Sequence, residues 1–191
     1  MFVPLFTCEL DRGKYQNLPD QPSCKECPAN TMSAEANSTQ CDACGIGEES
    51  DEDSAQCNKC GAGEAGVGIG GECAVCPWGQ YRTSDMDSGS CEDCPSGFSQ
   101  KSQGQASCLP CIPGKFQHLP GEASCEKCPE NTKSEEANST VCDSCGDGEK
   151  SEKGSAKCTK CEAGEAGTGV NGTCAACSSG QYRTSKMTNA T

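Results

Sequence analysis

The residues of this chain whose type and spacing can do chemistry are its cysteines. There are 21 cysteines among 191 residues, and all except Cys8 fall into ten Cys-x2-Cys pairs. The pairs stand at 24/27, 41/44, 57/60, 73/76, 91/94, 108/111, 125/128, 142/145, 158/161 and 174/177, and so recur at nearly even intervals along the chain. Thiols in such pairs either oxidise to disulfides or bind zinc as thiolates.

Disulfides and zinc sites make different demands on the rest of the chain. The spacing between one pair and the next is close to that of a zinc ribbon. Zinc arrays of this type, however, sit in reducing compartments and often carry His ligands and basic surroundings. This chain has one histidine, His118, and a net charge of −13, and its evenly spaced pairs show no grouping two by two. The sequence therefore favours disulfides, with an intracellular zinc-binding array as the alternative.

The composition supports a disulfide-rich extracellular protein. Phe, Ile, Leu and Val together number only 17, which with a net charge of −13 is typical of disorder. So high a cysteine content instead indicates a scaffold held by disulfides, without one large hydrophobic core. The acidic balance argues against nucleic acid and anionic membranes as partners. No apolar run approaches the roughly 18 residues of a membrane span.

Two pairings of the cysteines leave one cysteine over. In the first, the second Cys of each pair closes a loop with the first Cys of the next pair. In the second, adjacent pairs interlock, as Cys24–Cys41 with Cys27–Cys44, and Cys8 remains free. We favour the first because it treats every repeat alike and accounts for both ends of the chain. Its disulfides are Cys8–Cys24, Cys27–Cys41, Cys44–Cys57, Cys60–Cys73, Cys76–Cys91, Cys94–Cys108, Cys111–Cys125, Cys128–Cys142, Cys145–Cys158 and Cys161–Cys174, with Cys177 unpaired within this segment.

A longer period of 101 residues lies on top of the short one. GEAGVGIGGEC (63–73) returns as GEAGTGVNGTC (164–174), and GQYRTSDM (79–86) returns as GQYRTSKM (180–187). Six short repeats thus make one super-repeat, as in arrays whose units contact mainly their neighbours.

This period divides the chain into three parts. We expect a partial leading repeat at 1–23, a first six-unit super-repeat at 24–124 and a second super-repeat at 125–191. Adding 101 to Cys91 gives 192, one residue beyond Thr191, so we expect a segment of a longer repetitive protein. Residues 1–7 lack the basic region and the apolar run of a signal peptide.

A fixed turn is predicted after every cysteine pair. Gly and Asn tolerate a positive φ, and one of them stands three residues after the second Cys of each pair. These residues are Asn30, Gly47, Gly63, Gly79, Gly97, Gly114, Asn131, Gly148, Gly164 and Gly180. The fold expected is an elongated ladder of small disulfide-rich repeats, with short loops, two-stranded β ribbons and little or no helix. Tyr81, Phe116 and Tyr182, two residues beyond the turn, are expected to pack on their own disulfides.

Two stretches resemble a known family. CPWGQY (76–81) resembles the cysteine-rich repeats of tumour-necrosis-factor receptors, and CIPGKFQHLPGEASCEKC (111–128) is similar to the ephrin-receptor-like cysteine-rich repeat. The resemblance covers nearly all of the chain. In the receptors, the Cys before the Gly-aromatic pair bonds to the next Cys, which implies the first pairing here. The loops after Cys44, Cys60, Cys145 and Cys161 depart from the family by lacking the aromatic.

The resemblance also implies where such a protein works. Long arrays of this repeat are common in large surface proteins of protists and algae, including proteins similar to those of flagellar hairs (mastigonemes). Four Asn-x-Ser/Thr sequons fit an extracellular or cell-surface protein that takes the secretory pathway and carries N-glycans. The sequons are at Asn37, Asn138, Asn171 and Asn189, and the first two are equivalent in the 101-residue period.

Catalytic and cofactor motifs are missing. His118 lies beside Leu119 and is expected to be solvated, and paired cysteines provide no thiol nucleophile. GEAGVGIGG (63–71) is bracketed by cysteines and is interpreted as a turn, and GDGEKS (146–151) lacks the order of a phosphate loop. The acidic residues at 51–53 lack EF-hand spacing and are interpreted as a solvated cluster. We expect no enzyme, no metal site and no cofactor, with calcium possible but unsupported.

The sequence leaves two hypotheses for the function. The first is a structural protein, a disulfide-laddered rod segment of a surface filament, flagellar hair or coat, whose partners are other copies or other proteins of the assembly. The alternative is a receptor or adhesion ectodomain that binds a protein ligand through an exposed aromatic or Arg cluster. Arg82 and Arg183, each next to a Tyr, are the candidates for such a cluster. Trp78 and Tyr81 are expected to cover a disulfide rather than to form a recognition patch.

Overall fold

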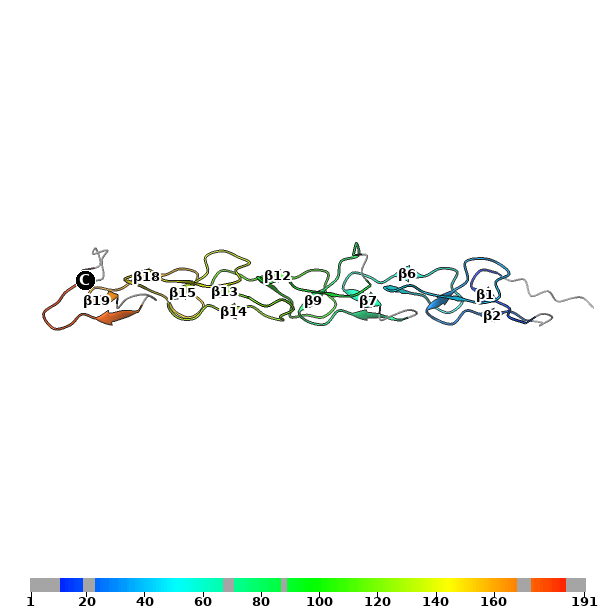
Figure 1. Cartoon of the computed structure of the whole chain (residues 1–191), viewed down its shortest axis with the longest axis horizontal. Helices are drawn as coiled ribbons and strands as arrows, with labels where there is room; N and C mark the ends of the chain where they lie inside the picture. Colours follow the sequence, from blue (N-terminus) through cyan, green and yellow to red (C-terminus); the bar gives the residue numbers. More distant parts are fainter. Residues whose placement is uncertain (1–10, 19–22, 67–70, 87–88, 168–172, 185–191) are drawn as a thin grey trace, which may run out of the picture. The chain divides into compact units, whose positions relative to one another are not determined.

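The secondary structure consists of short paired strands. The computed structural model describes residues 11–18, 23–66, 71–86, 89–167 and 173–184. Its described residues contain no helix, and therefore none long and apolar enough to cross a membrane. The predicted fold, with small repeats, two-stranded ribbons and no large core, is confirmed (Figure 1).

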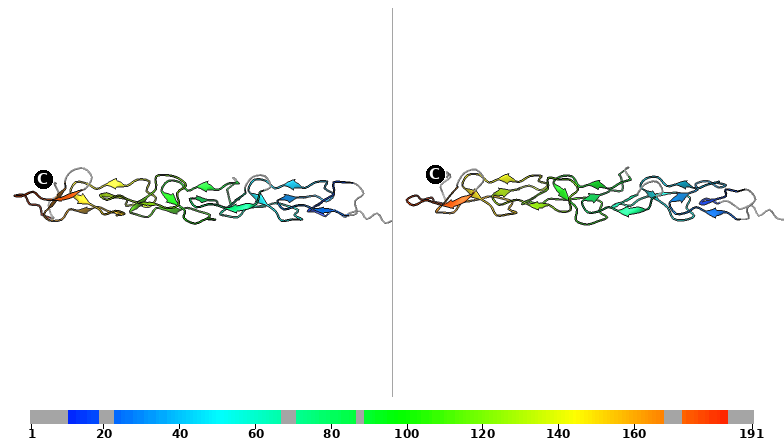
Figure 2. Two further views of the ribbon diagram at one scale, coloured as in Figure 1. Left: turned by 90° about the horizontal axis from the view of Figure 1, so that it is seen from below. Right: turned by 60° about the horizontal axis from the view of Figure 1, so that its bottom comes forward.

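Consecutive strands pair into two-stranded ribbons, ten of them in the described residues, and none of these ribbons is part of a larger sheet (Figure 2). In β13–β14, for example, Lys115 lies opposite Lys127 and Phe116 opposite Glu126. The strands are β1 (Lys14–Tyr15), β2 (Lys25–Glu26), β3 (Thr31–Met32), β4 (Asp42–Ala43), β5 (Glu48–Glu49), β6 (Asn58–Lys59), β7 (Glu64–Gly66), β8 (Cys73–Val75), β9 (Gln80–Tyr81), β10 (Glu92–Asp93), β11 (Phe98–Ser99), β12 (Leu109–Pro110), β13 (Lys115–Phe116), β14 (Glu126–Lys127), β15 (Thr132–Lys133), β16 (Asp143–Ser144), β17 (Glu149–Lys150), β18 (Thr159–Lys160), β19 (Glu165–Gly167) and β20 (Cys174–Ala176).

Nine disulfides lie beside these ribbons in the described residues, each with its second cysteine just before or at the start of the ribbon's second strand. The bonds join the second Cys of one pair to the first Cys of the next pair, and we call the closed segment a loop. Their Cα–Cα distances of 5.5 to 5.7 Å lie in the usual range for disulfides. The bonds are Cys27–Cys41, Cys44–Cys57, Cys60–Cys73, Cys76–Cys91, Cys94–Cys108, Cys111–Cys125, Cys128–Cys142, Cys145–Cys158 and Cys161–Cys174.

The loops belong to two compact units. Residues 1–77, 81–92 and 103–107 form the first unit, and residues 78–80, 93–102 and 108–191 form the second. Each unit contains the same kind of loop and the same contacts between loops. The first unit contains the disulfides from Cys27–Cys41 to Cys76–Cys91, and the second those from Cys94–Cys108 onward.

The turn predicted after each cysteine pair is confirmed. All ten Gly and Asn residues at this position have a positive φ, from 60° at Asn131 to 88° at Gly180. In the loop that starts at Cys111, Lys115 N donates to Ile112 O at 3.0 Å, which makes Gly114 the third residue of a β-turn. A positive φ at the third residue of a turn favours Gly or Asn. We call this residue the first-turn residue of its loop.

The core of each unit is narrow and made largely of sulfur. In each described disulfide, the cysteine that is second in its Cys-x2-Cys pair is buried, whereas its partner, the first cysteine of the next pair, is half-buried. Ala65 is the one buried apolar side chain among the described residues apart from cysteine. Because so little apolar surface is buried, disulfides and backbone hydrogen bonds must hold the loops together.

Candidate functional site

The contact between successive loops is the feature that the structure repeats most regularly. In the described residues, the second Cys of every pair donates its backbone N–H to the carbonyl of the preceding first-turn residue, at 2.7 to 3.0 Å. Cys128 N, for instance, donates to Gly114 O. The first-turn N–H in turn donates to a carbonyl in the next loop, as Gly114 N does to Ser134 O at 2.8 Å. Seven first turns are thus bonded to the following loop through both N–H and carbonyl, namely those at Asn30, Gly63, Gly79, Gly97, Gly114, Asn131 and Gly164.

A buried polar position lies six residues after the second Cys, and the sequence analysis did not find it. Its members are Ser33, Ser50, Gly66, Arg82, Gln100, Gln117, Ser134, Ser151, Gly167 and Arg183. Seven of the eight with a side chain are buried, including Gln117 at 2% exposure, and Ser151 is half-buried. In the eight members with a side chain, the backbone carbonyl accepts a hydrogen bond from the N–H of a turn in the preceding loop. The signal was present in the sequence as a polar or Gly residue at one constant offset.

The buried side chains satisfy polar groups close by. Gln117 Nε2 donates to Ser124 O at 2.9 Å, and its Oε1 accepts from Leu119 N at 3.0 Å. Ser151 Oγ instead crosses to the preceding loop and donates to Thr132 O at 2.7 Å. Buried polar groups without partners are costly, so each of these contacts both orders its loop and avoids that cost.

A second left-handed turn follows in six of the loops. Its residue has a positive φ and lies nine or ten positions after the second Cys. The N–H of this second-turn residue donates to the preceding loop, to the carbonyl of the cysteine with which that loop begins. Asn138 N, for example, donates to Cys111 O at 2.9 Å. The bond is present wherever the disulfide of the preceding loop is described. The second-turn residues are Asn37, Asp53, Gly104, Gly121, Asn138 and Gly154.

The second turn also reaches the loop next but one. A Cβ atom on Gly97 would lie 2.3 Å from Asn138 O, and one on Gly79 would lie 1.9 Å from Gly121 O. Both distances are far shorter than any van der Waals contact, so these first turns accept no side chain. Glycine here therefore serves two purposes, because it permits the positive φ and leaves room for another loop's peptide.

Arg82 occupies the buried polar position of its loop and is only 2% exposed. Its Nη1 atom donates to the carbonyls of Cys60 and Glu64, at 3.2 and 3.0 Å, and Nη2 donates to Met86 O at 3.3 Å. The guanidinium thus binds backbone carbonyls on either side of the first turn in the preceding loop. Arginine suits this task because several N–H donors project in one plane.

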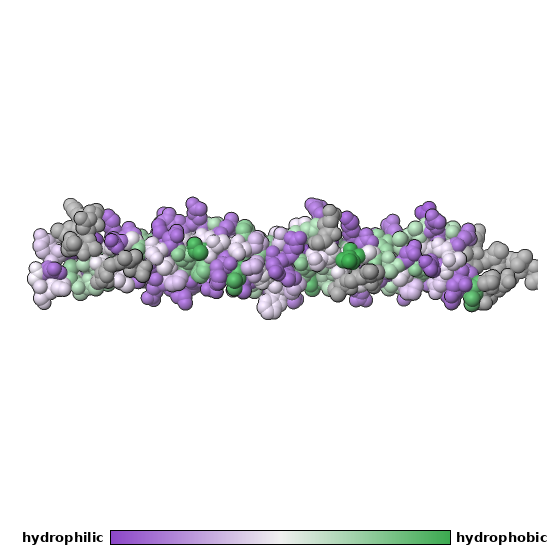
Figure 3. Space-filling model, in the orientation of Figure 1, coloured by the Kyte–Doolittle hydropathy of each residue, from purple (hydrophilic) through white to green (hydrophobic). Residues whose placement is uncertain are grey.

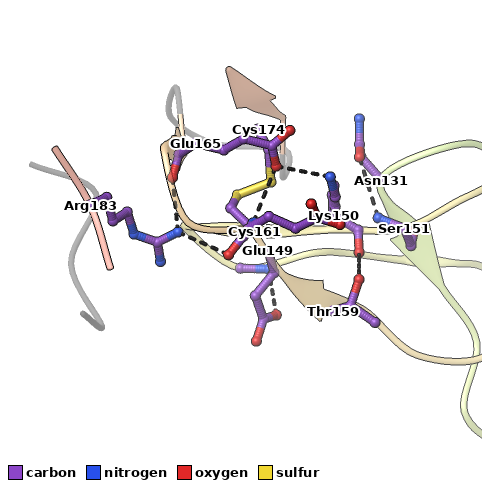
Figure 4. The surroundings of a disulfide bond; sticks show 11 residues. Asn131, Glu149, Lys150, Ser151, Thr159, Cys161, Glu165, Cys174 and Arg183 are labelled. Carbon is purple, nitrogen blue, oxygen red and sulfur yellow. Dashed lines mark hydrogen bonds and ion pairs between the residues drawn. A yellow bond between two sulfur atoms is a disulfide. The ribbon is translucent and has the colours of Figure 1, made fainter. Parts of the chain in front are cut away.

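Arg183 makes the same contacts one super-repeat later, and is 5% exposed. Its Nη1 atom donates to Cys161 O at 3.3 Å and to Glu165 O at 3.1 Å (Figure 4). The hypothesis that Arg82 and Arg183 form an exposed recognition cluster is therefore wrong. Their place in the repeat, six residues after the second Cys, turns both side chains into the unit.

The aromatic residues are more exposed than the sequence suggested. Tyr182 is 74% exposed and Trp78 is 63% exposed, so neither is buried as a cover for a disulfide. Tyr81 and Phe116 are half-buried. Tyr182 precedes the inward-pointing Arg183, and its own side chain is left on the surface. The Phe116 ring stacks on His118 with centroids 6.0 Å apart, and His118 itself is exposed.

Equivalent positions of the two super-repeats differ in charge. Lys150 Nζ bonds to Glu165 Oε2 at 2.9 Å (Figure 4), and this hydrogen bond raises the pKa of Lys150 and lowers the pKa of Glu165. In the first super-repeat a carboxylate, Glu49, replaces the lysine, and its Oε2 accepts from Cys73 N at 3.0 Å. Open hollows lie beside both positions. The charged residues that line the first are Glu49, Asp51 and Glu72, and those that line the second are Lys150 and Lys157 together with Glu130, Glu152 and Glu162.

The remaining predicted site residues can be placed as follows. Asp51, Glu52 and Asp53 are all exposed, and no group of three His, Cys, Asp or Glu side chains within the described ranges could hold a metal ion. Cys177 is half-buried and has no disulfide partner there. The sequon residues Asn37 and Asn138 are exposed. Cys8, with its expected bond to Cys24, and the sequons at Asn171 and Asn189 lie outside the described residues.

Comparison with known proteins agrees with this geometry. Residues 67–107 and 99–145 each match the family described as "Tyrosine-protein kinase ephrin type A/B receptor-like". A search of curated proteins gives no match to the chain. Both matched stretches lie inside the ladder, and the repeats outside them have the same turn and disulfide pattern. Residues 67–145 are thus ephrin-receptor-like cysteine-rich repeats, set in a repeat array whose disulfides and family indicate an extracellular protein.

Proposed function

We propose that this chain is a non-enzymatic structural segment of a longer extracellular protein, in which stacked disulfide loops form a rod within a filament, flagellar hair or coat. The observation that carries the proposal is the repetition of one backbone contact, from second Cys to first-turn carbonyl, at every pair of the described chain. Contacts that join a loop to the next loop and the next but one build a quasi-one-dimensional array. Such an array resists bending through many equal contacts rather than through one core.

The surface supports the same proposal. The face seen in Figure 3 is mostly hydrophilic, with hydrophobic residues in small separate areas. The chain has a net charge of −13 on 191 residues, so copies of it repel one another. This repulsion favours solubility and opposes close packing of the chains. Assembly with other copies or other extracellular proteins would therefore depend on a few specific contacts, at a cell surface reached through the secretory pathway.

Small-angle X-ray scattering of the secreted, oxidised chain tests the rod. A compact domain of this length would have a radius of gyration of about 16 Å, and an unfolded chain about 47 Å. We expect a value well above that of the compact domain, together with a linear cross-section region, which an unfolded chain does not give. A radius of gyration close to the compact value would contradict the proposal.

The second candidate is a ligand-binding ectodomain, and the exposure of Trp78 favours it. A Trp with 63% of its surface exposed is a common anchor of protein interfaces. If the chain binds a protein ligand, replacing Trp78 by Ala should abolish its adhesion to a surface that carries the ligand. If the chain is purely structural, the same replacement should leave its small-angle scattering profile unchanged. The variant Leu109→Ala, at another exposed apolar residue, is the control.

A further inference from the structure

The structure describes two of the four sequons, and they occupy the same place in the repeat. Asn37 and Asn138 are second-turn residues with φ of 64° and 63°. Both side chains are exposed, as are those of Thr39 and Thr140, which complete the sequons. The hydroxyl and the amide that define each sequon are thus both on the surface.

The middle residue of each sequon faces the other way. Ser139 is half-buried, its Oγ donates to Glu136 O at 2.9 Å, and its carbonyl accepts from Gln117 N at 3.0 Å. Ser38 makes the equivalent contacts with Glu35 and Gln16. The turn therefore directs the serine into the ladder and leaves the Asn and the Thr outside.

At Asn138, the peptide and the side chain have separate roles. The backbone N–H bonds to Cys111 O, and the backbone carbonyl lies where a Cβ on Gly97 would be. The Asn138 side-chain amide makes no hydrogen bond with the described residues, so a group attached to it would leave these stacking contacts intact.

Other asparagines of the array show the opposite arrangement. Asn30 and Asn131 are first-turn residues, and their Oδ1 atoms accept from Ser50 N and Ser151 N, each at 3.4 Å. Their amides are part of the contact between loops, and neither begins a sequon. The chain thus separates asparagines that hold loops together from asparagines that project outward.

We propose that Asn37 and Asn138 carry N-linked oligosaccharides, one in each super-repeat, attached at a turn whose peptide remains in the stack. The donor is an oligosaccharide linked to a lipid through pyrophosphate. The side-chain Nδ2 atom bonds to C1 of the first sugar, the bond from C1 to the pyrophosphate oxygen breaks, and the amide loses one proton as the lipid pyrophosphate leaves. This inference rests on the proposed passage through the secretory pathway.

Mass spectrometry of the full chain secreted from eukaryotic cells tests the inference. An amidase that removes N-glycans converts each glycosylated Asn to Asp, and the conversion is read from non-reduced peptides. We expect conversion at residues 37 and 138 in protein whose Cys111–Cys125 and Cys128–Cys142 bonds are formed. Unconverted Asn at both positions in correctly paired protein would overturn the inference. Free thiols throughout would instead overturn the proposed extracellular function.

Matched variants separate loss of the glycan from damage to the turn. Asn138→Gly keeps a residue suited to positive φ, as Gly121 and Gly154 do in the neighbouring loops. It should lose the glycan at 138 and keep both neighbouring disulfides. Thr140→Ala should also lose that glycan, whereas Thr140→Ser should retain it. Conversion at 138 that survives Thr140→Ala would contradict N-glycosylation through this sequon.

Discussion

A Cβ atom on Gly114 would lie 2.2 Å from the carbonyl oxygen of Gly154, two loops further along the chain. The first-turn glycine of one loop thus determines whether the second turn of another loop fits. Gly114 N also donates to Ser134 O, and Gly114 O accepts from Cys128 N. One residue therefore connects its own loop to each of the next two loops.

Gly114→Ala should destabilise its unit more than Gly164→Ala does. The φ values are 84° and 85°, and both glycines make the same two kinds of backbone hydrogen bond, so both variants bear a left-handed strain of about 1–2 kcal/mol. For Gly164, however, no atom of the described residues lies within 4 Å of an added Cβ. The thermal unfolding midpoint and the yield of correctly paired disulfides measure the difference. Equal losses in the two variants would show that the contact with Gly154 contributes nothing.

Arg82→Met should destabilise the first unit by about 2–3 kcal/mol, because the variant keeps a long apolar side chain but leaves buried carbonyls without donors. Hydrogen exchange should quicken at the amides of Gly63 and Glu64, in the turn that Arg82 holds. Arg12→Met, at an exposed arginine, is the control and should have little effect. Unchanged exchange in Arg82→Met would mean that water replaces the guanidinium without loss.

Reduction should unfold the array, whereas a chelator should leave it folded. Each disulfide-closed loop contributes about 3 kcal/mol through the entropy of the unfolded chain, and the buried apolar side chains of the described residues, Ala65 and the cysteines themselves, are too few to replace it. Limited proteolysis with and without dithiothreitol, and with EDTA alone, measures the effect. Cleavage that EDTA by itself accelerates would favour the zinc alternative.

Lys150→Met should raise the pKa of Glu165. The hydrogen bond from Lys150 lowers the pKa of this carboxyl, so the stabilisation is present above the unfolded-state pKa and is lost as the pH falls through the folded-state value. The pKa of Lys150 is raised. The stabilisation that comes from this shift is therefore present below the unfolded-state pKa of the amine, and it is lost as the pH rises through the folded-state pKa.

Titration of the Glu165 side chain by NMR checks this prediction. Lys133→Met, which removes a different ion pair, with Glu135, serves as the control and should leave Glu165 unchanged. The same Glu165 pKa in Lys150→Met and in the unaltered protein would show that the ion pair does not persist in solution.

The local conformation of each loop could be read from the sequence alone. Gly or Asn at one offset predicted ten left-handed turns, and all ten have a positive φ, because the cost of that conformation depends on the residue itself. That the described part of the chain has no helix and no large core was likewise predicted from composition and spacing. The cysteine spacing left two pairings open, and the nine described disulfides follow the one that joins the second Cys of each pair to the first Cys of the next pair.

What the tertiary structure decided is the direction in which each side chain points. Arg82 beside Tyr81 was a candidate for recognition, yet the arginine is buried on backbone carbonyls. The second turns, and the room that Gly97 leaves for Asn138, arise between a loop and the loop next but one along the chain. Contacts of this kind depend on how one loop stacks on the next. They cannot be predicted from the backbone preferences of single residues, because those preferences act only within a loop.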